Sequence, residues 1–384
     1  MLGNFTRVRC GMQGLILKDY LIKDDQLFID FISKHDELYD SAQIDLDSII
    51  FSLNNLFPND YEKQKFYLKK CYSQYRDAIK PHILLEYFTM QGDREEVENL
   101  LKSERELDYP EMRTWLSIYS ILSERKDGLL SGTDLIDAIF RVKNTNNETL
   151  ILSLIIHLYG ISETGLYEPF HKVRRVVKPM VDYIENDFLR ESYSIRLAEM
   201  EVITYLYMNK IDLCREKCLE VIEKSELEVY FPVTYAIFHH LMGQSFTFEN
   251  YDIAKYWVEK AMAIVSTLPP DYRDTRMIYL INTMDFLNSY WGINLDAEPY
   301  DEAELAHRYV VTGRTQEAVH ILDGLKIENG YLTSYQLFFY GIATENNQIL
   351  QVARDVFISN SNYFYLQLLN PENVQKYQDR LRGK

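Results

Sequence analysis

Apolar residues recur at three- and four-residue spacing from about Ile44 onward, the period of helices that bury one face. Short polar breaks separate the apolar runs, for example at residues 91–93, 144–147 and 328–330. No alternating pattern of the kind found in half-buried strands persists between these breaks. The pattern therefore predicts an all-α fold of helices joined by short turns.

A recurring pair of positions indicates that the helices form repeated hairpins. At four places a small or branched residue follows a turn residue by five positions; the pairs are Gly92 and Val97, Asn209 and Cys214, Glu249 and Ala254, and Gly313 and Ala318. Near the third pair, Gly243 precedes Ala254 and Ala261, small residues seven apart that let two helices approach closely. This spacing predicts a tetratricopeptide-like helical-repeat superhelix, with a plain helical bundle as the alternative.

Three of the four pairs fit one phase. Cys214 and Ala254 are 40 residues apart, and Val97 and Cys214 are 117 apart, which is three times 39. Ala318 departs from it, because it follows Ala254 by 64 residues. The length of the repeat is therefore expected to vary along the chain.

Three regions of the chain differ in pattern. Residues 1–43 lack the repeat phase and are interpreted as a small N-terminal helical region, a candidate DNA-binding module. Residues 44–360 form the helical-repeat domain, and residues 361–384 carry an aromatic segment, a break at Pro371 and a charged final helix. A terminal unit of a solenoid has to cover an apolar face, by capping or by pairing with another copy. We therefore expect capping and homodimerisation through the C-terminal end.

Composition supports a helical protein and limits its partners. The chain has 15 Gly and 10 Pro among 384 residues, too few for turn-dense sandwiches or barrels. Its 41 Lys and Arg against 58 Asp and Glu give a net charge of −17, so any contact with double-stranded DNA requires a local basic patch. The longest apolar run, residues 150–161, is too short to cross a membrane. No secretory signal is evident, so we expect a cytoplasmic protein with reduced cysteines.

Basic residues cluster near the N-terminal end. Residues 61–80 hold six cations, Lys63, Lys65, Lys69, Lys70, Arg76 and Lys80, against two acids. If one helix spans them, Lys65, Lys69, Arg76 and Lys80 form a stripe on one face. Arg7, Arg9, Lys18 and Lys23 form a second basic group. Two such groups fit phosphate contacts beside a DNA-reading domain, although a solvated face explains either one alone.

The chain shows no sequence pattern of a familiar enzyme. A Gly-rich phosphate loop, a nucleophile elbow and a zinc-protease motif are all missing from it, so we predict no catalytic residues and no cofactor. Cys214 and Cys218 lie four apart, but no second pair at zinc spacing follows, so they are expected to pack and to bind no metal. His240 is a candidate ligand contact, with a packed or surface histidine as the alternative. Carboxylate groups such as Glu199 with Glu201 are explained by solvated faces.

Several stretches together resemble the arbitrium receptors of Bacillus phages, AimR, which are peptide-sensing tetratricopeptide regulators. The likeness is carried by residues 45–50 and 57–61, 84–87, 188–197, 243–245 with 250–251, 286–291 and 313–318. It spans about residues 44–360. The resemblance implies a cytoplasmic dimer with an N-terminal helix-turn-helix, a repeat domain that binds a short secreted peptide, and transcriptional control of the lysis–lysogeny decision.

The N-terminal region departs from that family pattern. Helices are expected near residues 13–22 and 26–35, but the tight turn and the recognition helix of a helix-turn-helix are not clear. The alternative is a prophage paralogue without DNA binding that acts as a protein–protein interaction scaffold.

The peptide contacts are placed by repeat phase on inner helices, where acidic and amide side chains could hold a peptide with a basic residue. The candidates are Arg196, Glu199, His240, Gln244, Asn282 and Asp285. Asn282 and Asp285 are three apart on one helix and are expected to share a face.

Overall fold

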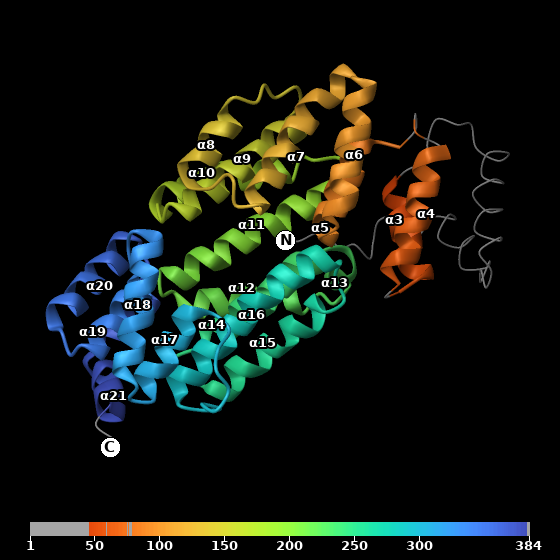
Figure 1. Cartoon of the computed structure of the whole chain (residues 1–384). Helices are drawn as coiled ribbons and strands as arrows, with labels where there is room; N and C mark the ends of the chain where they lie inside the picture. Colours follow the sequence, from red (N-terminus) through yellow and green to blue (C-terminus); the bar gives the residue numbers. More distant parts are fainter. Residues whose placement is uncertain (1–45, 59, 75, 77–78, 382–384) are drawn as a thin grey trace. The chain divides into compact units, whose positions relative to one another are not determined.

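The structure, a computed structural model, describes residues 46–381 apart from residues 59, 75, 77 and 78 (Figure 1). Every regular element in these described residues is a helix, and no strand occurs among them. The predicted all-α class is confirmed. The expected helices at residues 13–22 and 26–35, and the boundary between residues 43 and 44, lie outside the described residues.

The chain divides into two compact units. The smaller unit runs to Leu84 and also takes in Asn186–Phe188. Its described helices are α3 (Leu46–Leu56), α4 (Tyr61–Gln74) and the first residues of α5 (Pro81–Gln91). Helices α3 and α4 pack on each other. Because α5 and α11 (Asp187–Tyr207) both begin in this unit and continue into the larger one, the two units share two helices.

The larger unit comprises Leu85–Glu185 and Leu189–Lys384. Besides parts of α5 and α11, its elements are α6 (Arg94–Leu107), η1 (Pro110–Met112), α7 (Arg113–Lys126), α8 (Gly132–Phe140), α9 (Asn147–Glu163), α10 (Tyr167–Val181), α12 (Ile211–Ile222), α13 (Glu226–Tyr230), α14 (Pro232–Ser245), α15 (Tyr251–Val265), α16 (Pro270–Trp291), α17 (Glu302–Val311), α18 (Thr315–Asn329), α19 (Ser334–Ala343), α20 (Asn347–Ser359), η2 (Tyr365–Leu369) and α21 (Pro371–Leu381). The polar breaks expected at residues 91–93, 144–147 and 328–330 coincide with helix boundaries.

The hairpin pattern of the sequence is confirmed. Gly92, Asn209 and Gly313 adopt the left-handed conformation that ends one helix and starts the next, with φ of 76°, 56° and 78°. The residues five positions later, Val97, Cys214 and Ala318, are buried in the first turn of the second helix. Ala254 is buried in the same place after the turn at residues 249–250.

Two further hairpins of this kind escaped the sequence pattern. Gly165 is left-handed and Phe170 is fully buried; Glu345 is left-handed and Leu350 is buried. Both buried residues are large, so a search for small residues could not find them. Phe170 follows Val97 by 73 residues and precedes Cys214 by 44. The common 39-residue phase is therefore wrong, and the length of the repeat varies more widely than expected.

Close helix approach explains the small residues of the α14–α15 hairpin. A Cβ atom on Gly243 would lie 2.7 Å from Cγ2 of Val258 and 2.9 Å from the carbonyl oxygen of Ala254. Ala254 and Ala261 are fully buried on the facing side of α15. The two backbones thus meet where side chains are smallest, as the spacing predicted.

Helix α11 lies in the middle of the larger unit, between α7–α10 and α12–α16 (Figure 1). Parts of the larger unit that are distant in sequence also contact one another. The amide of Gln91 donates to the carbonyl oxygens of Val229 and Tyr230 at 3.1 and 3.2 Å. The backbone N–H groups of Tyr363 and Phe364 donate to the carbonyl oxygen of Tyr207, the last residue of α11. Segments that are more than 130 residues apart in the sequence therefore contact one another within the larger unit.

The C-terminal segment packs against a group of aromatic side chains. The aromatic helix expected from residue 361 is shorter than predicted: Tyr363 and Phe364 lie in a turn, and the short helix η2 begins at Tyr365. Pro371 is the first residue of α21. Tyr377 of α21 is fully buried, and its hydroxyl lies 2.7 Å from Nε2 of His307. The guanidinium of Arg380 donates to the carbonyl oxygens of Ser289 and Tyr290. Homodimerisation through this end stays a prediction.

Cys71, Cys214 and Cys218 are free and buried, while Cys10 lies outside the described residues. Within the described part of the chain, no group of His, Cys, Asp and Glu side chains is arranged to hold a metal ion. The same residues contain no helix with the length and apolar character needed to traverse a bilayer.

Candidate functional site

The six candidate peptide contacts lie on three helices of the larger unit. Arg196 and Glu199 are on α11, His240 and Gln244 are on α14, and Asn282 and Asp285 are on α16. The structure brings some of them together and separates others, so each is described with its neighbours.

Arg196 is held by a buried carboxylate. Its Nε and Nη2 atoms donate to the two oxygens of Glu86 at 2.8 and 3.1 Å, and its Nη1 reaches the hydroxyl of Tyr159 at 3.4 Å. Glu86 also accepts hydrogen bonds from Tyr119 and Ser192. Burial alone would raise the pKa of Glu86, but the charge of Arg196 and these hydrogen bonds outweigh it and lower that pKa.

Glu199, one turn further along α11, has no such partner. No hydrogen bond or ion pair joins its carboxylate to any described residue, and it is partly exposed. Burial raises its pKa, and the charges of Arg125, Arg196, Arg276 and Lys126 only partly oppose that rise. Side chains from α7, α11 and α16 therefore share one electrostatic environment around Glu199.

His240 connects α14 with α16. Its Nδ1 lies 3.0 Å from Nη2 of Arg276, and its Nε2 lies 2.8 Å from the hydroxyl oxygen of Thr283. Burial and the charge of Arg276 hold the pKa of His240 well below its usual range, so the ring is neutral at physiological pH. Arg276 can only donate, so Nδ1 accepts. The proton is then on Nε2, which donates to Thr283.

We define the α11 cluster as Lys126, Arg196, Glu199, His240 and Arg276. It contains three of the six predicted residues. The other two members, Lys126 and Arg276, were missed, as was Glu86. Lys126 lies outside the hairpin positions on which the prediction relied, and Arg276 lies on α16 two turns before the residues chosen there. Glu86 is 110 residues from its partner, a separation that carries no signal in one sequence.

The remaining candidates lie elsewhere. Gln244 is partly buried on α14, one turn after His240. The Oδ1 atom of Asn282 is buried and accepts no hydrogen bond from the described residues. Burial raises the pKa of half-buried Asp285; the charge of Arg308 opposes this rise, and that of Asp301 adds to it.

Asp285 belongs to an acidic group at the start of α17. Burial and the charges of Asp301 and Asp285 raise the pKa of Glu304 well above its usual range, against the charge of Arg308. Glu304 in turn contributes to the raised pKa values of Tyr335 and Tyr365, which burial raises most. We call Asp285, Asp301 and Glu304 the acidic group.

The basic stripe predicted on one helix does not form as expected. Helix α4 ends at Gln74, so Lys65 and Lys69 are on it while Arg76 and Lys80 follow it. Pro81 begins α5, and the residue before a proline disfavours the helical conformation, so the chain has to leave α4 before this point.

Among the α4 lysines, Lys63, Lys69 and Lys70 are exposed, and Lys65 pairs with Glu62 at 3.0 Å. Arg7, Arg9, Lys18 and Lys23 lie outside the described residues. The DNA-contact role of both basic groups stays a prediction.

A sequence model of the family described as AimR transcriptional regulator-like matches residues 63–370. The chain belongs to the AimR family.

Individual relatives agree with this assignment. The AimR transcriptional regulator of Bacillus phage SPbeta is 21% identical over 328 residues, which cover 83% of this chain and 82% of that protein. An uncharacterized protein of Bacillus anthracis is 26% identical over 246 residues, 63% of this chain and 91% of the relative.

Two solved structures share the fold. The phAimR–ligand structure has a TM-score of 0.70 at 19% identity and covers 85% of this chain and 96% of its own. Selenomethionine phAimR has a TM-score of 0.62 at 18% identity and covers 95% and 99%. The match confirms the predicted helical-repeat architecture. The AimR family is one of transcriptional regulators, in agreement with the prediction that this chain is not an enzyme.

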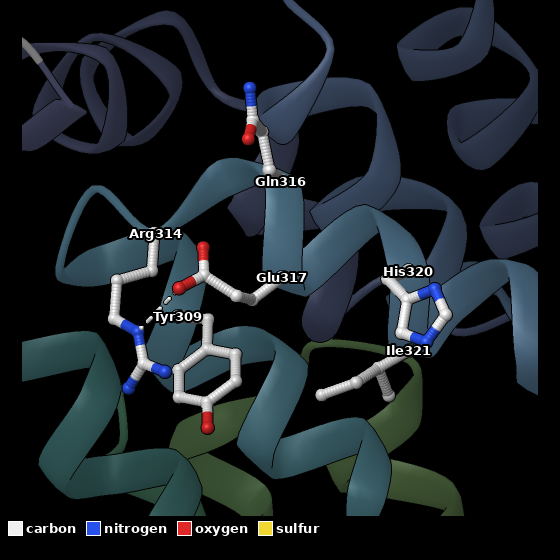
Figure 2. A pocket seen from close by; sticks show the side chains of 6 residues that line it. All are labelled: Tyr309, Arg314, Gln316, Glu317, His320 and Ile321. Carbon is white, nitrogen blue, oxygen red and sulfur yellow. Dashed lines mark hydrogen bonds and ion pairs between the residues drawn. The ribbon is translucent and has the colours of Figure 1, made fainter.

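A hollow of this AimR-family chain is lined by no residue of the α11 cluster or of the acidic group. It has a volume of about 510 Å³ and lies at the α17–α18 turn, where Figure 2 shows Tyr309, Arg314, Gln316, Glu317, His320 and Ile321 around it. The charge of Arg314 is compensated by Glu317 at 3.1 Å and Glu298 at 3.4 Å. None of the candidate peptide contacts lines this hollow.

Proposed function

We propose that this chain is a phage or prophage transcriptional regulator of the lysis–lysogeny decision that senses a short signalling peptide with the larger unit. The observation that carries the proposal is the α11 cluster, in which Lys126, Glu199 and Arg276 have no ion-pair partner among the described residues. Several cations gathered around one carboxylate whose pKa is raised favour a binding site there.

A peptide fits the charge distribution of the larger unit. The acidic group offers carboxylates to a basic side chain or a terminal amine, while Lys126 and Arg276 offer positive charge. The unpaired amide oxygen of Asn282 suits a backbone N–H donor. The phAimR structure with a ligand, which shares this fold, supports the same assignment.

The smaller unit is the proposed DNA-binding part. The exposed lysines of α4 supply positive charge to a chain whose net charge is −17. Two helices, α5 and α11, belong to both units, so a peptide that shifts the equilibrium between two arrangements of the larger unit would also act on the smaller one. A cytoplasmic homodimer formed through the C-terminal end would place two such units on one operator.

A paralogue without DNA binding is the second candidate, since the cationic stripe expected on α4 is interrupted at Gln74. Such a protein would bind peptide and act as a scaffold.

The two candidates are separated by selection from random DNA duplexes at fixed salt, with the full chain and with a version that lacks residues 1–43. A regulator enriches a common sequence that the shortened chain does not retain; a scaffold enriches none. Peptide sensing is tested by affinity selection from pooled synthetic hexapeptides that contain one Arg, with calorimetry on each recovered peptide. Recovery of no peptide contradicts the sensing function.

A further inference from the structure

Helix α10 is the most basic of the described helices in the larger unit, although the whole chain has a net charge of −17. It carries four cations and one acid, which are Lys172, Arg174, Arg175, Lys178 and Glu168. Arg174 is compensated by the fold, because it pairs with Glu201 of α11 at 2.5 Å. The other three cations are exposed.

The exposed cations of α10 have no strong partner within the chain. Lys172 pairs with Glu168 at 2.8 Å, but the two side chains are 71% and 82% exposed, so this pair contributes little. The side chains of Arg175 and Lys178 form no ion pair or hydrogen bond with any described residue. The acids of this segment lie at its two ends, with Glu168 in the first turn and Asp182 at the C-cap. The middle of α10 therefore presents unpaired positive charge.

Exposed apolar residues lie beside these cations. Val176 is 62% exposed, Pro179 follows it on the same helix, and Tyr183 in the turn after the helix is 84% exposed. At about 100° per residue, Val176 and Pro179 share one side of the helix with the three exposed cations. We call this surface the α10 face; it consists of Lys172, Arg175, Val176, Lys178, Pro179 and Tyr183.

The opposite side of α10 holds the helix in the fold. Phe170, Val177 and Val181 are buried there, and α10 packs against α9. The Arg174 ion pair joins α10 to α11. The α10 face takes no part in these contacts, so its side chains are available to another molecule. An exposed surface that combines apolar side chains with charged neighbours is typical of an interaction site.

The composition of the α10 face favours a protein partner over DNA. Phosphates would pair with the cations but would offer no apolar contact to Val176 and Tyr183. Protein interfaces have an apolar centre and a polar rim, and Tyr and Arg are enriched in them. Carboxylates on the partner would complement Arg175 and Lys178 and steer the two surfaces together. An acidic segment with apolar residues on the same side therefore matches both parts of the face.

We propose that the α10 face binds an acidic amphipathic segment of another protein. This site goes beyond the proposed peptide sensing and DNA binding and depends on neither of them. It shares no residue with the α11 cluster or with the acidic group. In the second candidate function it is the contact surface of the scaffold.

The test is affinity selection with the full chain from two pools of peptides about 14 residues long, roughly four helical turns. Both pools carry randomly chosen Leu, Ile, Val or Phe at every third or fourth position. The first pool has Glu at several positions between them, and the second has Gln in place of each Glu. At about 0.15 M salt we expect the Glu pool to be enriched about tenfold or more over the Gln pool. Equal recovery of the two pools overturns the proposal.

Two double variants with the same change in net charge locate the binding surface. Arg175→Glu with Lys178→Glu is expected to abolish the preference for the Glu pool. Lys102→Glu with Lys326→Glu, at exposed positions of α6 and α18, is expected to keep it. Circular dichroism verifies that each variant is folded. A preference that survives the α10 reversal, or that is lost equally in both double variants, contradicts the site.

Val176→Gln separates a protein partner from DNA, because it removes an apolar contact and no charge. It should lower the enrichment of the Glu pool about fivefold and leave the affinity for a random-sequence duplex unchanged. An enrichment that Val176→Gln does not change contradicts the apolar part of the site. If the duplex affinity falls on reversal of Arg175 and Lys178 while the Glu pool is not enriched, the face binds phosphates and the proposal is wrong. Sedimentation of the native chain and of the same double variant tests a second copy as the occupant; a dimer that the reversal dissociates overturns the proposal.

Discussion

Arg196 and Glu199 are one turn apart on α11, yet their surroundings are opposite. Arg196 meets a buried carboxylate in a two-pronged ion pair, and that carboxylate has two further donors. Glu199 meets several cations at longer range and none directly. The charge of Arg196 is therefore balanced by the carboxylate of Glu86, while the charge of Glu199 has no ion-pair partner among the described residues. Charges on neighbouring turns of one helix can thus differ in whether the fold itself compensates them.

The largest expected effect comes from breaking the complete arrangement. Glu86→Gln leaves the Arg196 guanidinium buried without a countercharge, and we expect the free energy of unfolding to fall by about 3–5 kcal/mol. Urea denaturation followed by circular dichroism measures this. The double variant Glu86→Leu with Arg196→Met, which removes both charges, should recover most of the loss. A single variant as stable as the native chain would show that the ion pair contributes nothing.

A smaller effect of opposite sign is expected at Glu199. Its pKa is raised in the folded state, so it opposes folding as the pH rises above the usual carboxyl range. Glu199→Gln should therefore stabilise the chain by up to about 1 kcal/mol at neutral pH, and the gain should vanish in acid.

Glu86 supplies the contrast in the same pH titration. Its pKa is lowered in the folded state, so its contribution is present above the unfolded value near 4.3 and is lost as the pH falls. Denaturation of the native chain, Glu86→Gln and Glu199→Gln over a pH series separates the two. The same sign of pH dependence for both carboxylates would contradict the distinction.

The smallest effect on stability is expected for a pair at the surface. Lys65 and Glu62 meet at 3.0 Å on α4, and the Glu62 side chain is 73% exposed. Lys65→Gln should change the free energy of unfolding by less than about 0.5 kcal/mol. If Lys65 contacts a DNA phosphate, the same variant lowers the slope of log affinity against log salt by about 0.9. An unchanged slope on a selected duplex argues against that contact.

The repeated hairpins could be predicted because their signal is local. A turn residue and a buried residue five positions later are set by backbone conformation and by the closeness of two adjacent helices, as at Gly92 with Val97. Phe170 occupies the same position after a left-handed turn residue and is buried, but it is large, so a search for small or branched residues does not find it. The hairpin rule therefore identified the architecture and missed some of its members.

The candidate site could be predicted only in part, because its members meet through tertiary packing. Repeat phase selected Arg196 and Glu199 on α11 and His240 on α14, and their role as peptide contacts stays a prediction. It gave no information about Lys126 and Arg276, since the neighbours of each, Thr89 and His240, come from other helices that are distant in sequence. On α16, the choice of Asn282 and Asp285 was two turns away from Arg276. A shift of this size follows when one long helix of 22 residues is assigned a single inward face.

The two helices joined by Glu86 and Arg196 also decide where the protein can be cut. A truncation between Leu84 and Leu85 would follow the boundary of the units but leave Glu86 as the second residue of a new chain end. The first amide groups of a helix have no partners within it, so such an end frays and would weaken the ion pair. A deletion that ends at residue 43 keeps α5 whole. Loss of peptide binding by a chain that begins at Leu85 would thus report on folding. Only the chain that begins at residue 44 can separate peptide sensing from DNA binding.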